Sequence, residues 1–213
     1  MELVKALSNR QYIDGEWVES SNKNTRDIIN PYNQETIFTV AEGTKEDVER
    51  AILAARRSFE DGEWSLETSE VRGKKVRAVA DKIKENREEL AKLETLDTGK
   101  TLEESYADMD DIHNVFMYFA GLADKDGGEI INSPIPNAES KVVKEPVGVV
   151  TQITPWNYPL LQASWKIAPA LATGCSLVMK PSEITPLTTI RVFELMEEVG
   201  FPKGTINLVL GAG

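Results

Sequence analysis

The final third of this 213-residue chain alternates apolar runs with helical segments in the order strand, helix, strand, helix, strand. Apolar runs typical of buried strands occupy residues 147–153, 176–179 and 205–210. The residues between them, 158–172 and 186–199, have helical patterns, and helices of this length are the usual crossovers between parallel strands. This βαβαβ order predicts an α/β fold that contains one half of a doubly wound, mononucleotide-binding sheet.

Residues 1–126 precede this pattern and combine strands with helices. Asp14 and Gly15 lie between two alternating apolar and polar stretches, which is a strong hairpin signal, and we expect residues 1–41 to form one small antiparallel β unit. Residues 44–47 resemble a helix capping box with aspartate in place of glutamate. Apolar residues then recur at helical spacing, which predicts four amphipathic helices.

Residues 127–146 have a different composition, with paired glycines, prolines and alternating valine and lysine residues. This pattern predicts a β-ribbon or arm rather than part of the core. The chain is therefore expected to have three parts: an N-terminal β and helical part at 1–126, the arm at 127–146, and the half-sheet at 147–213.

The charge balance excludes some functions. Lys and Arg number 24 against 35 Asp and Glu, so the formal net charge is −11, which argues against binding to nucleic acid or to an anionic membrane surface. No run of about 18 apolar residues is present, as a membrane span would require. The single cysteine, Cys175, excludes an intrachain disulfide and, without a Cys/His cluster, a zinc site. We expect a cytoplasmic protein.

Two turns follow the first two strands of the predicted half-sheet, at residues 153–159 and 180–183. Ligands of open α/β sheets gather at the carboxyl ends of the strands, so we expect the two turns to lie side by side. The first turn lacks the Gly-x-Gly-x-x-Gly fingerprint of ordinary dinucleotide folds. In the second turn, Lys180, Ser182 and Glu183 could hold a ribose and repel a 2′-phosphate. A solvated turn is the simpler alternative.

The same turns carry a family resemblance. Residues 154–159, 165–174 and 180–186, together with 93–100, resemble the NAD(P)-dependent aldehyde dehydrogenases, and within that family the betaine-aldehyde dehydrogenases. The resemblance implies a partial Rossmann-like cofactor-binding domain, and it assigns residues 127–144 to an arm that pairs subunits into a homo-oligomer, a dimer or a tetramer. It also implies NAD-dependent oxidation of a small-molecule aldehyde, betaine aldehyde, to the osmoprotectant glycine betaine.

The resemblance implies catalytic roles for two residues. Asn157 matches an asparagine whose amide helps to hold the oxyanion formed when a thiolate adds to the aldehyde. A helix N-cap is the plain alternative for this asparagine. Lys166 matches a lysine described as a relay group in betaine-aldehyde enzymes, and a lysine packed along a helix face is the alternative.

The resemblance also implies a nicotinamide cofactor bound along both turns. Residues of the first turn match the wall along the cofactor, and residues of the second match the grip on the adenosine ribose. Glu183 favours NAD, and NADP remains an alternative. The implied cofactor-binding residues are Ile153, Thr154, Pro155, Trp156, Lys180, Pro181, Ser182 and Glu183.

Two aromatic residues point to the substrate. Tyr158 and Trp165 are seven residues apart, so a helix would project both from one face, roughly 10.5 Å apart along its axis. Two aromatic rings can flank a quaternary ammonium by cation–π attraction, and the resemblance implies such a box for betaine aldehyde. A pair of core aromatics is the alternative.

A potassium site is implied by the resemblance as well. It would use the carboxylate of Asp97 together with the main chain of Ile28 and Ile29. The alternative is that Asp97 is an ordinary helix-terminal carboxylate.

Three elements of the family do not occur in this chain: the nucleophilic cysteine, the general-base glutamate and the glycine-rich turn near the nicotinamide pyrophosphate. Cys175 cannot replace the nucleophile, because it opens a buried strand where a small apolar thiol is inert. We therefore expect the N-terminal portion of a longer dehydrogenase, without a catalytic domain and inactive alone. Two alternatives stay open, a non-catalytic nucleotide-binding or interaction module and a dehydrogenase for another small aldehyde.

Overall fold

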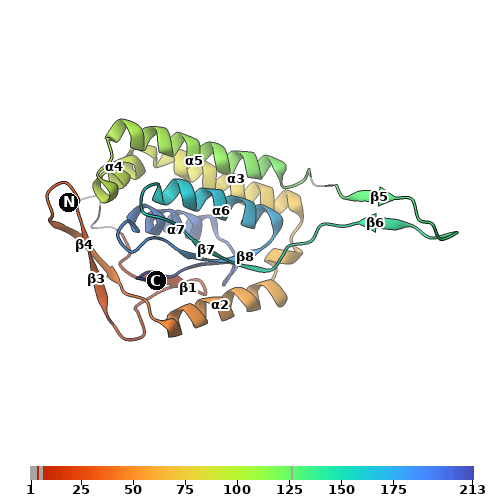
Figure 1. The fold of residues 1–213 in the computed structure, drawn as a ribbon, viewed down its shortest axis with the longest axis horizontal. Coiled ribbons are helices and arrows are strands. Elements are labelled where there is room, and N and C mark those ends of the chain that lie inside the picture. The colour runs from red at the N-terminus through yellow and green to blue at the C-terminus, as the bar shows by residue number, and fades with distance from the viewer. Residues whose placement is uncertain (1–3, 5–6, 126) are drawn as a thin grey trace.

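Three parallel strands form the centre of the fold. In the computed structural model, which describes residues 4, 7–125 and 127–213, they pair in the order β9-β8-β7. The register sets Ile153 opposite Lys180 and Met179 opposite Leu208, so the three strands end at the same edge of the sheet (Figure 1). Their bounds are Val149–Ile153 for β7, Ser176–Lys180 for β8 and Ile206–Leu208 for β9.

Two helices connect these strands and lie on one face of the sheet (Figure 1). The first begins with Pro159, which suits a first helical position because it needs no N–H partner there. Both helices end at glycines with left-handed backbone, Gly174 at φ 89° and Gly200 at φ 80°. The predicted βαβαβ order is therefore confirmed. The bounds are Pro159–Thr173 for α6 and Leu187–Val199 for α7.

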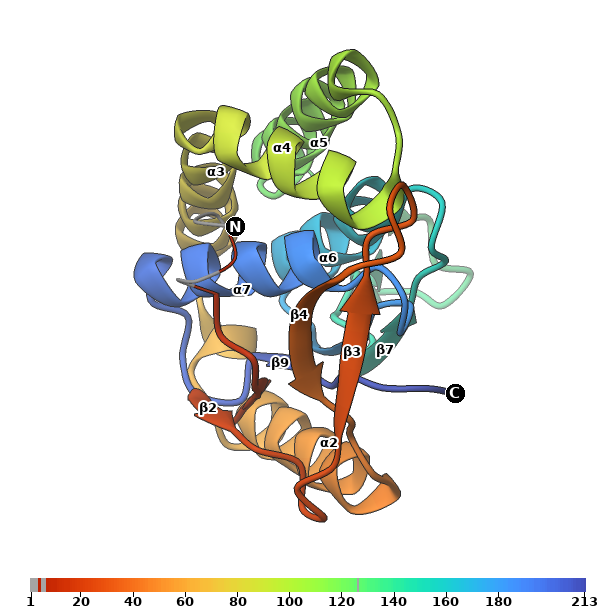
Figure 2. The ribbon, with the colours of Figure 1, turned by 90° about the vertical axis from the view of Figure 1, so that its left-hand side faces the viewer.

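The other helices complete the layers. One of them, α2, covers the opposite face of the sheet, whereas α3, α4 and α5 form an outer layer over α6 and α7 (Figure 1, Figure 2). Ala51, Ala54 and Ala55 let α2 lie close to Val178 and Val209. None of the helices in the described part of the chain combines the length and the apolar character that a membrane span needs. The bounds are Lys45–Glu60 for α2, Trp64–Leu66 for the 3-10 turn η1, Ser69–Glu85 for α3, Arg87–Thr98 for α4 and Leu102–Leu122 for α5.

The prediction of one β unit over residues 1–41 is wrong. The first hairpin pairs antiparallel with β9, where Tyr12 lies opposite Leu208, and so extends the central sheet to five strands. The second pair of strands, within residues 25–41, forms a two-stranded sheet of its own (Figure 2). The free edge of β9 carries backbone groups that need partners, and β1 supplies them, a choice that local periodicity does not encode. The bounds are Gln11–Ile13 for β1, Glu16–Val18 for β2, Thr25–Ile29 for β3 and Thr36–Ala41 for β4.

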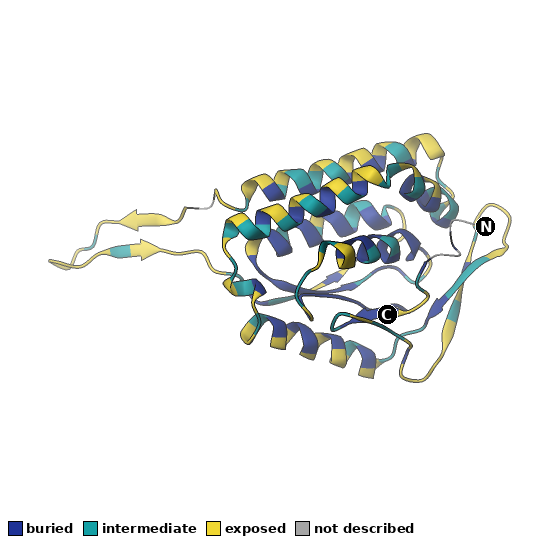
Figure 3. Cartoon of the chain, turned by 180° about the vertical axis from the view of Figure 1, so that it is seen from behind, coloured by how far each residue is buried: buried dark blue, intermediate teal, exposed yellow. Residues whose placement is uncertain are grey.

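Between α5 and β7 the chain leaves the body of the protein as a two-stranded ribbon (Figure 1). β5 (Glu129–Ile131) pairs antiparallel with β6 (Ser140–Val142), and most of the ribbon is exposed (Figure 3). Ile130 is 81% exposed and the nearby Val143 is 71% exposed. The predicted ribbon is thus present, and it offers apolar side chains to solvent.

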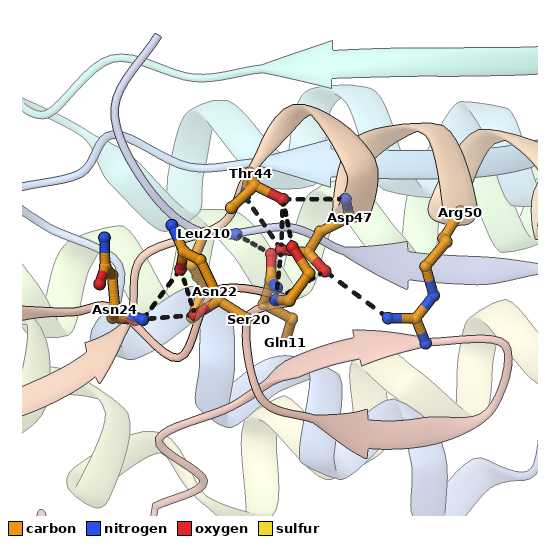
Figure 4. A network of polar contacts seen from close by, with 9 residues as sticks. Gln11, Ser20, Asn22, Asn24, Thr44, Asp47, Arg50 and Leu210 are labelled. Carbon is orange, nitrogen blue, oxygen red and sulfur yellow. Dashed lines mark hydrogen bonds and ion pairs between the residues drawn. The ribbon is translucent and has the colours of Figure 1, made fainter.

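A buried carboxylate joins the start of α2 to distant segments (Figure 4). The predicted capping box is confirmed: Thr44 Oγ1 accepts from the N–H of Asp47 at 3.3 Å, and Asp47 Oδ2 accepts from the N–H of Thr44 at 3.0 Å. Asp47 also accepts from the N–H of Ser21 at 3.1 Å. Burial by itself raises the pKa of Asp47, but the hydrogen bonds from Thr44 and Ser21 outweigh it and hold the pKa below its usual value. The carboxylate therefore stabilises the fold while it is ionised.

Replacing Asp47 with alanine should lower the free energy of unfolding by about 3 kcal/mol, because buried N–H donors lose a charged acceptor. Urea unfolding at pH 7 measures this loss. The matched control is Glu46→Ala, which removes the exposed neighbouring carboxylate and should change stability by less than about 0.5 kcal/mol. Equal losses in the two variants would show that the buried network adds nothing specific.

Candidate functional site

The carboxyl edge of the sheet brings the two predicted turns together. The N–H of Thr154 donates to the carbonyl oxygen of Lys180 at 3.2 Å, directly after the strands β7 and β8. Thr185 Oγ1 donates to the carbonyl oxygen of Trp156 at 3.2 Å, which ties the segment after β8 to the turn after β7. The prediction that the two turns lie side by side is confirmed. We name this region the strand-end site; it comprises residues 153–158 and 180–186.

The second turn is ordered by its own polar contacts. Lys180 Nζ donates to the carbonyl oxygens of Pro181 at 3.0 Å and Gly211 at 2.8 Å. Burial lowers the pKa of Lys180, while the neighbouring carboxylates of Glu183 and Glu42 act in the opposite direction. The backbone around the lysine is therefore fixed rather than freely solvated. The hydroxyl of Ser182, which is buried, lies 3.5 Å from Glu183 Oε2.

The first turn presents apolar side chains to solvent. Ile153 is 67% exposed and Trp156 is 59% exposed, and Pro155 between them is exposed as well. Thr154, by contrast, is buried, and its hydroxyl has no hydrogen-bond partner in the described part of the chain. A bound ligand would cover the apolar side chains and could pair the hydroxyl. The turn therefore fits the cofactor wall that the resemblance implies.

Asn157 lies at the exposed end of the first turn. The N-cap position of α6 belongs to Tyr158, and no side chain caps the helix there. The alternative that Asn157 is an N-cap is therefore wrong. Its amide makes no hydrogen bond to any residue that the structure describes, so its N–H groups are available to a ligand at the strand-end site.

Trp165 lies on α6 and is half exposed. It opens onto a surface hollow of about 500 Å³ between α5 and α6, with Tyr118, Phe119 and Leu161 among its neighbours. A core aromatic is thus the wrong interpretation for Trp165. Its ring is available at the surface, as a substrate contact requires.

Tyr158 is held from two directions. Lys100 Nζ lies 4.2 Å from the centroid of the tyrosine ring, and the tyrosine hydroxyl donates to Glu104 Oε1 at 3.3 Å. Lys100 in turn is paired with Asp108 at 2.6 Å. No sequence pattern indicated Lys100 or Glu104 as contacts of Tyr158, although Lys100 ends one of the motifs that carry the family resemblance. These contacts fix the orientation of the aromatic ring before any substrate arrives.

Lys166 and Cys175 are two further residues whose roles the sequence raises. The side chain of Lys166 is half-buried, and its carbonyl oxygen accepts from Gln152 Nε2 at 2.9 Å. Its relay role stays a prediction. Cys175 is buried directly before β8, with its Sγ 3.6 Å from Thr173 Oγ1. It lies at the amino end of the strand, away from the strand-end site, which agrees with the expectation that it is not the nucleophile.

Two buried carboxyl groups lie behind the strand-end site. Asp97 Oδ2 accepts from the N–H of Leu187 at 2.8 Å, and Glu94 Oε2 accepts from the hydroxyl of Thr188 at 2.6 Å, so both hold the start of α7. The second carboxyl oxygen of each residue, Asp97 Oδ1 and Glu94 Oε1, has no hydrogen bond to the described residues. The ammonium of Lys100 lies 3.6 Å from Glu94 Oε1. Burial raises the pKa of Glu94 to about 7 and that of Asp97 well above its usual value.

The three residues of the predicted potassium site lie on neighbouring elements. An added Cβ on Gly99, directly after α4, would lie 2.8 Å from Pro31, so the end of α4 contacts the segment after β3. Ile28 and Ile29 end β3, and Asp97 lies near the end of α4. The carboxylate of Asp97 holds the start of α7 rather than the end of its own helix, and the potassium role stays a prediction. In the described ranges, no group of three or more His, Cys, Asp or Glu side chains could hold a metal ion.

The half-sheet, the ribbon and the strand-end site define the class of protein. The chain belongs to the aldehyde dehydrogenase family, whose model matches residues 17–213.

Individual members of the family are very similar to the chain. It is 67% identical over 97% of its length to a betaine aldehyde dehydrogenase of Bacillus subtilis (strain 168). It is 46% identical over 97% of its length to the peroxisomal aminoaldehyde dehydrogenase 1 of Pisum sativum. A crystal structure of betaine aldehyde dehydrogenase from Staphylococcus aureus in complex with NAD+ matches with a TM-score of 0.99 and 90% identity over 100% of the chain. The chain spans 42% of the length of each of these three proteins.

Proposed function

We propose that this chain forms the cofactor side of an NAD-dependent dehydrogenase that oxidises betaine aldehyde to glycine betaine, an osmoprotectant. The observation that carries the proposal is the strand-end site, where Asn157 and the trio of Lys180, Ser182 and Glu183 follow adjoining strands tied by the Thr185 to Trp156 hydrogen bond. Betaine aldehyde dehydrogenases at 67% and 90% identity, one of them in complex with NAD+, support it.

The cofactor would lie along both turns. Lys180 and Glu183 would hold the hydroxyls of the adenosine ribose, with Ser182 and Pro181 beside them, and Glu183 would disfavour the 2′-phosphate of NADP. When bound, NAD supplies the oxidising chemistry by accepting a hydride. The wall along the cofactor would be formed by Ile153, Thr154, Pro155 and Trp156.

Asn157 would act on the aldehyde itself. Its amide N–H₂ would donate to the aldehyde oxygen and stabilise the negative charge that develops there when a thiolate from another part of the enzyme attacks. Lys166, on α6, would serve as a proton relay. Cys175 takes no part, because it is buried at the opposite end of β8.

The substrate would meet Tyr158 and Trp165. An aromatic ring fixed by Lys100 and Glu104, together with a half-exposed indole, would flank the cationic nitrogen of betaine aldehyde. Aminoaldehydes are a second candidate, supported by the 46% identity to an aminoaldehyde dehydrogenase. Measuring kcat/KM for a trimethylammonium aldehyde and for a primary-amine aldehyde distinguishes the two candidate substrates.

The proposal also covers subunit pairing, a cation site and the cellular compartment. The ribbon would pair subunits into a dimer or tetramer, which its exposed apolar residues Ile130 and Val143 support. Asp97, with the main chain of Ile28 and Ile29, would hold a potassium ion, and the unpartnered oxygen of Asp97 supports this. The enzyme would be cytoplasmic.

Lys180→Met tests the cofactor assignment. It should weaken NAD binding at least about tenfold, because the adenosine ribose loses a charged donor. Quenching of tryptophan fluorescence on titration with NAD measures the Kd. Lys203→Met, at an exposed lysine outside the strand-end site, is the control and should bind NAD as the unaltered protein does. If the unaltered protein does not bind NAD, the proposed function is wrong; if both variants bind equally, Lys180 does not hold the ribose.

A further inference from the structure

A charged pair on the β3–β4 sheet lies beside the strand-end site. Arg26, in β3, and Glu42, directly after β4, form a two-pronged ion pair: Arg26 Nε lies 2.5 Å from Glu42 Oε2, and Arg26 Nη2 lies 2.8 Å from Glu42 Oε1. Both side chains are partly buried. Both carboxylate oxygens of Glu42 thus accept from Arg26, and this bidentate geometry fixes the two side chains relative to each other.

Backbone contacts place Glu42 next to Lys180. The N–H of Ala212 donates to Glu42 Oε1 at 3.1 Å, and the N–H of Gly43 donates to the carbonyl oxygen of Leu210 at 2.9 Å. The intervening residue, Gly211, accepts from Lys180 Nζ at 2.8 Å. The carboxylate of Glu42 and the ammonium of Lys180 therefore contact the same short segment after β9, Glu42 through Ala212 and Lys180 through Gly211.

The charges of this region act on one another. The hydrogen bond from Arg26 lowers the pKa of Glu42, and the ammonium of Lys180 acts in the same direction. The hydrogen bond to Glu42 raises the pKa of Arg26, and Glu183 adds to that rise. The cations of Arg26 and Lys180 thus interact with the carboxylates of Glu42 and Glu183 at the carboxyl edge of the sheet. The formal charges of these four groups sum to zero.

We propose that Glu42, held by Arg26, is a second residue that selects NAD over NADP, in addition to Glu183. This inference rests on the proposed function, because it requires the adenosine ribose at Lys180 and Glu183. A 2′-phosphate would bring a charge of about −1.5 to −2 toward the carboxylates of both glutamates. The guanidinium that could bind this phosphate is already occupied by Glu42. Neutralising Glu42 would remove one repulsive charge and release one phosphate-binding cation in a single step.

The test is the ratio of Kd for NADP to Kd for NAD, measured by tryptophan fluorescence at low ionic strength. Glu42→Gln should lower this ratio by about tenfold, a change expected for one charge removed near the phosphate. Arg26→Gln should raise the ratio, because it leaves the carboxylate without its cation. Opposite changes from two substitutions within one ion pair cannot result from a general loss of folding.

The matched control breaks a similar ion pair elsewhere. Arg87 and Asp110 form a two-pronged pair on the outer helices, with both contacts at 2.6 Å, so Asp110→Asn should leave the ratio unchanged. An unchanged ratio in both Glu42→Gln and Arg26→Gln, with normal NAD binding, overturns this inference and leaves the proposed function intact. No binding of NAD by the unaltered protein overturns both.

Discussion

Replacing Asn157 with alanine should lower kcat about 100- to 1,000-fold in a dehydrogenase of full family length that carries this chain. The amide of Asn157 is exposed, has no hydrogen bond to the described residues and lies at the strand end beside the proposed cofactor wall. We therefore expect its N–H₂ group to donate to the aldehyde oxygen when negative charge develops there. The measurement is NADH formation under steady-state conditions with saturating NAD and betaine aldehyde.

A second substitution separates donation from shape. Asn157→Asp keeps the size of the side chain but replaces the donor by a negative charge, so it should be at least as slow as the alanine variant. The Kd for NAD should stay within about twofold in both variants, because the role proposed for Asn157 concerns the aldehyde rather than the ribose. An alanine variant that keeps more than a third of the original kcat would rule out the oxyanion role.

The free energy of unfolding should fall by about 3 kcal/mol between pH 5 and pH 8. Burial raises the pKa of Glu94 from an ordinary 4.5 to about 7, so the folded state holds its proton more tightly than the unfolded chain does. This stabilisation is complete below pH 4.5 and is lost as the pH rises through 7. The pKa of Asp97 is raised in the same direction by burial, so it adds to the loss. Urea unfolding at several pH values measures the change.

Glu94→Gln should remove most of this pH dependence. The glutamine keeps an acceptor for the hydroxyl of Thr188 but cannot ionise. Glu88→Gln is the control, since Glu88 is exposed on the same helix and its pKa is lowered by Lys92, so it titrates below this pH window. A stability that is constant or rises from pH 5 to pH 8, or equal slopes in the two variants, would contradict the account of the buried pair.

The parallel half-sheet could be predicted from the sequence because its signals are local. Apolar runs, Pro159 at the start of α6 and glycines such as Gly174 at helix ends mark strands and crossovers within a few residues. The adjacency of the two turns then followed from a general property of parallel sheets, whose strands end at one edge. The confirmed part of the site is this adjacency.

Contacts between distant segments could not be predicted in this way. The pairing of β1 with β9 depends on which sheet edge stays free after the other strands have paired. The contact between Lys100 and Tyr158 depends on how α5 packs against α6. Asp97 reads as the end of its own helix, whereas its carboxylate caps α7 through Leu187. None of these partners leaves a periodic signal in the chain.

A crystal structure of the protein with bound NAD is the sharpest test of the proposed cofactor site. We expect the adenosine ribose hydroxyls within hydrogen-bond distance of Lys180 and Glu183, the cofactor along Ile153 and Trp156, and the amide of Asn157 facing the substrate side. A cofactor found at the amino edge of the strands, near Cys175, would contradict it.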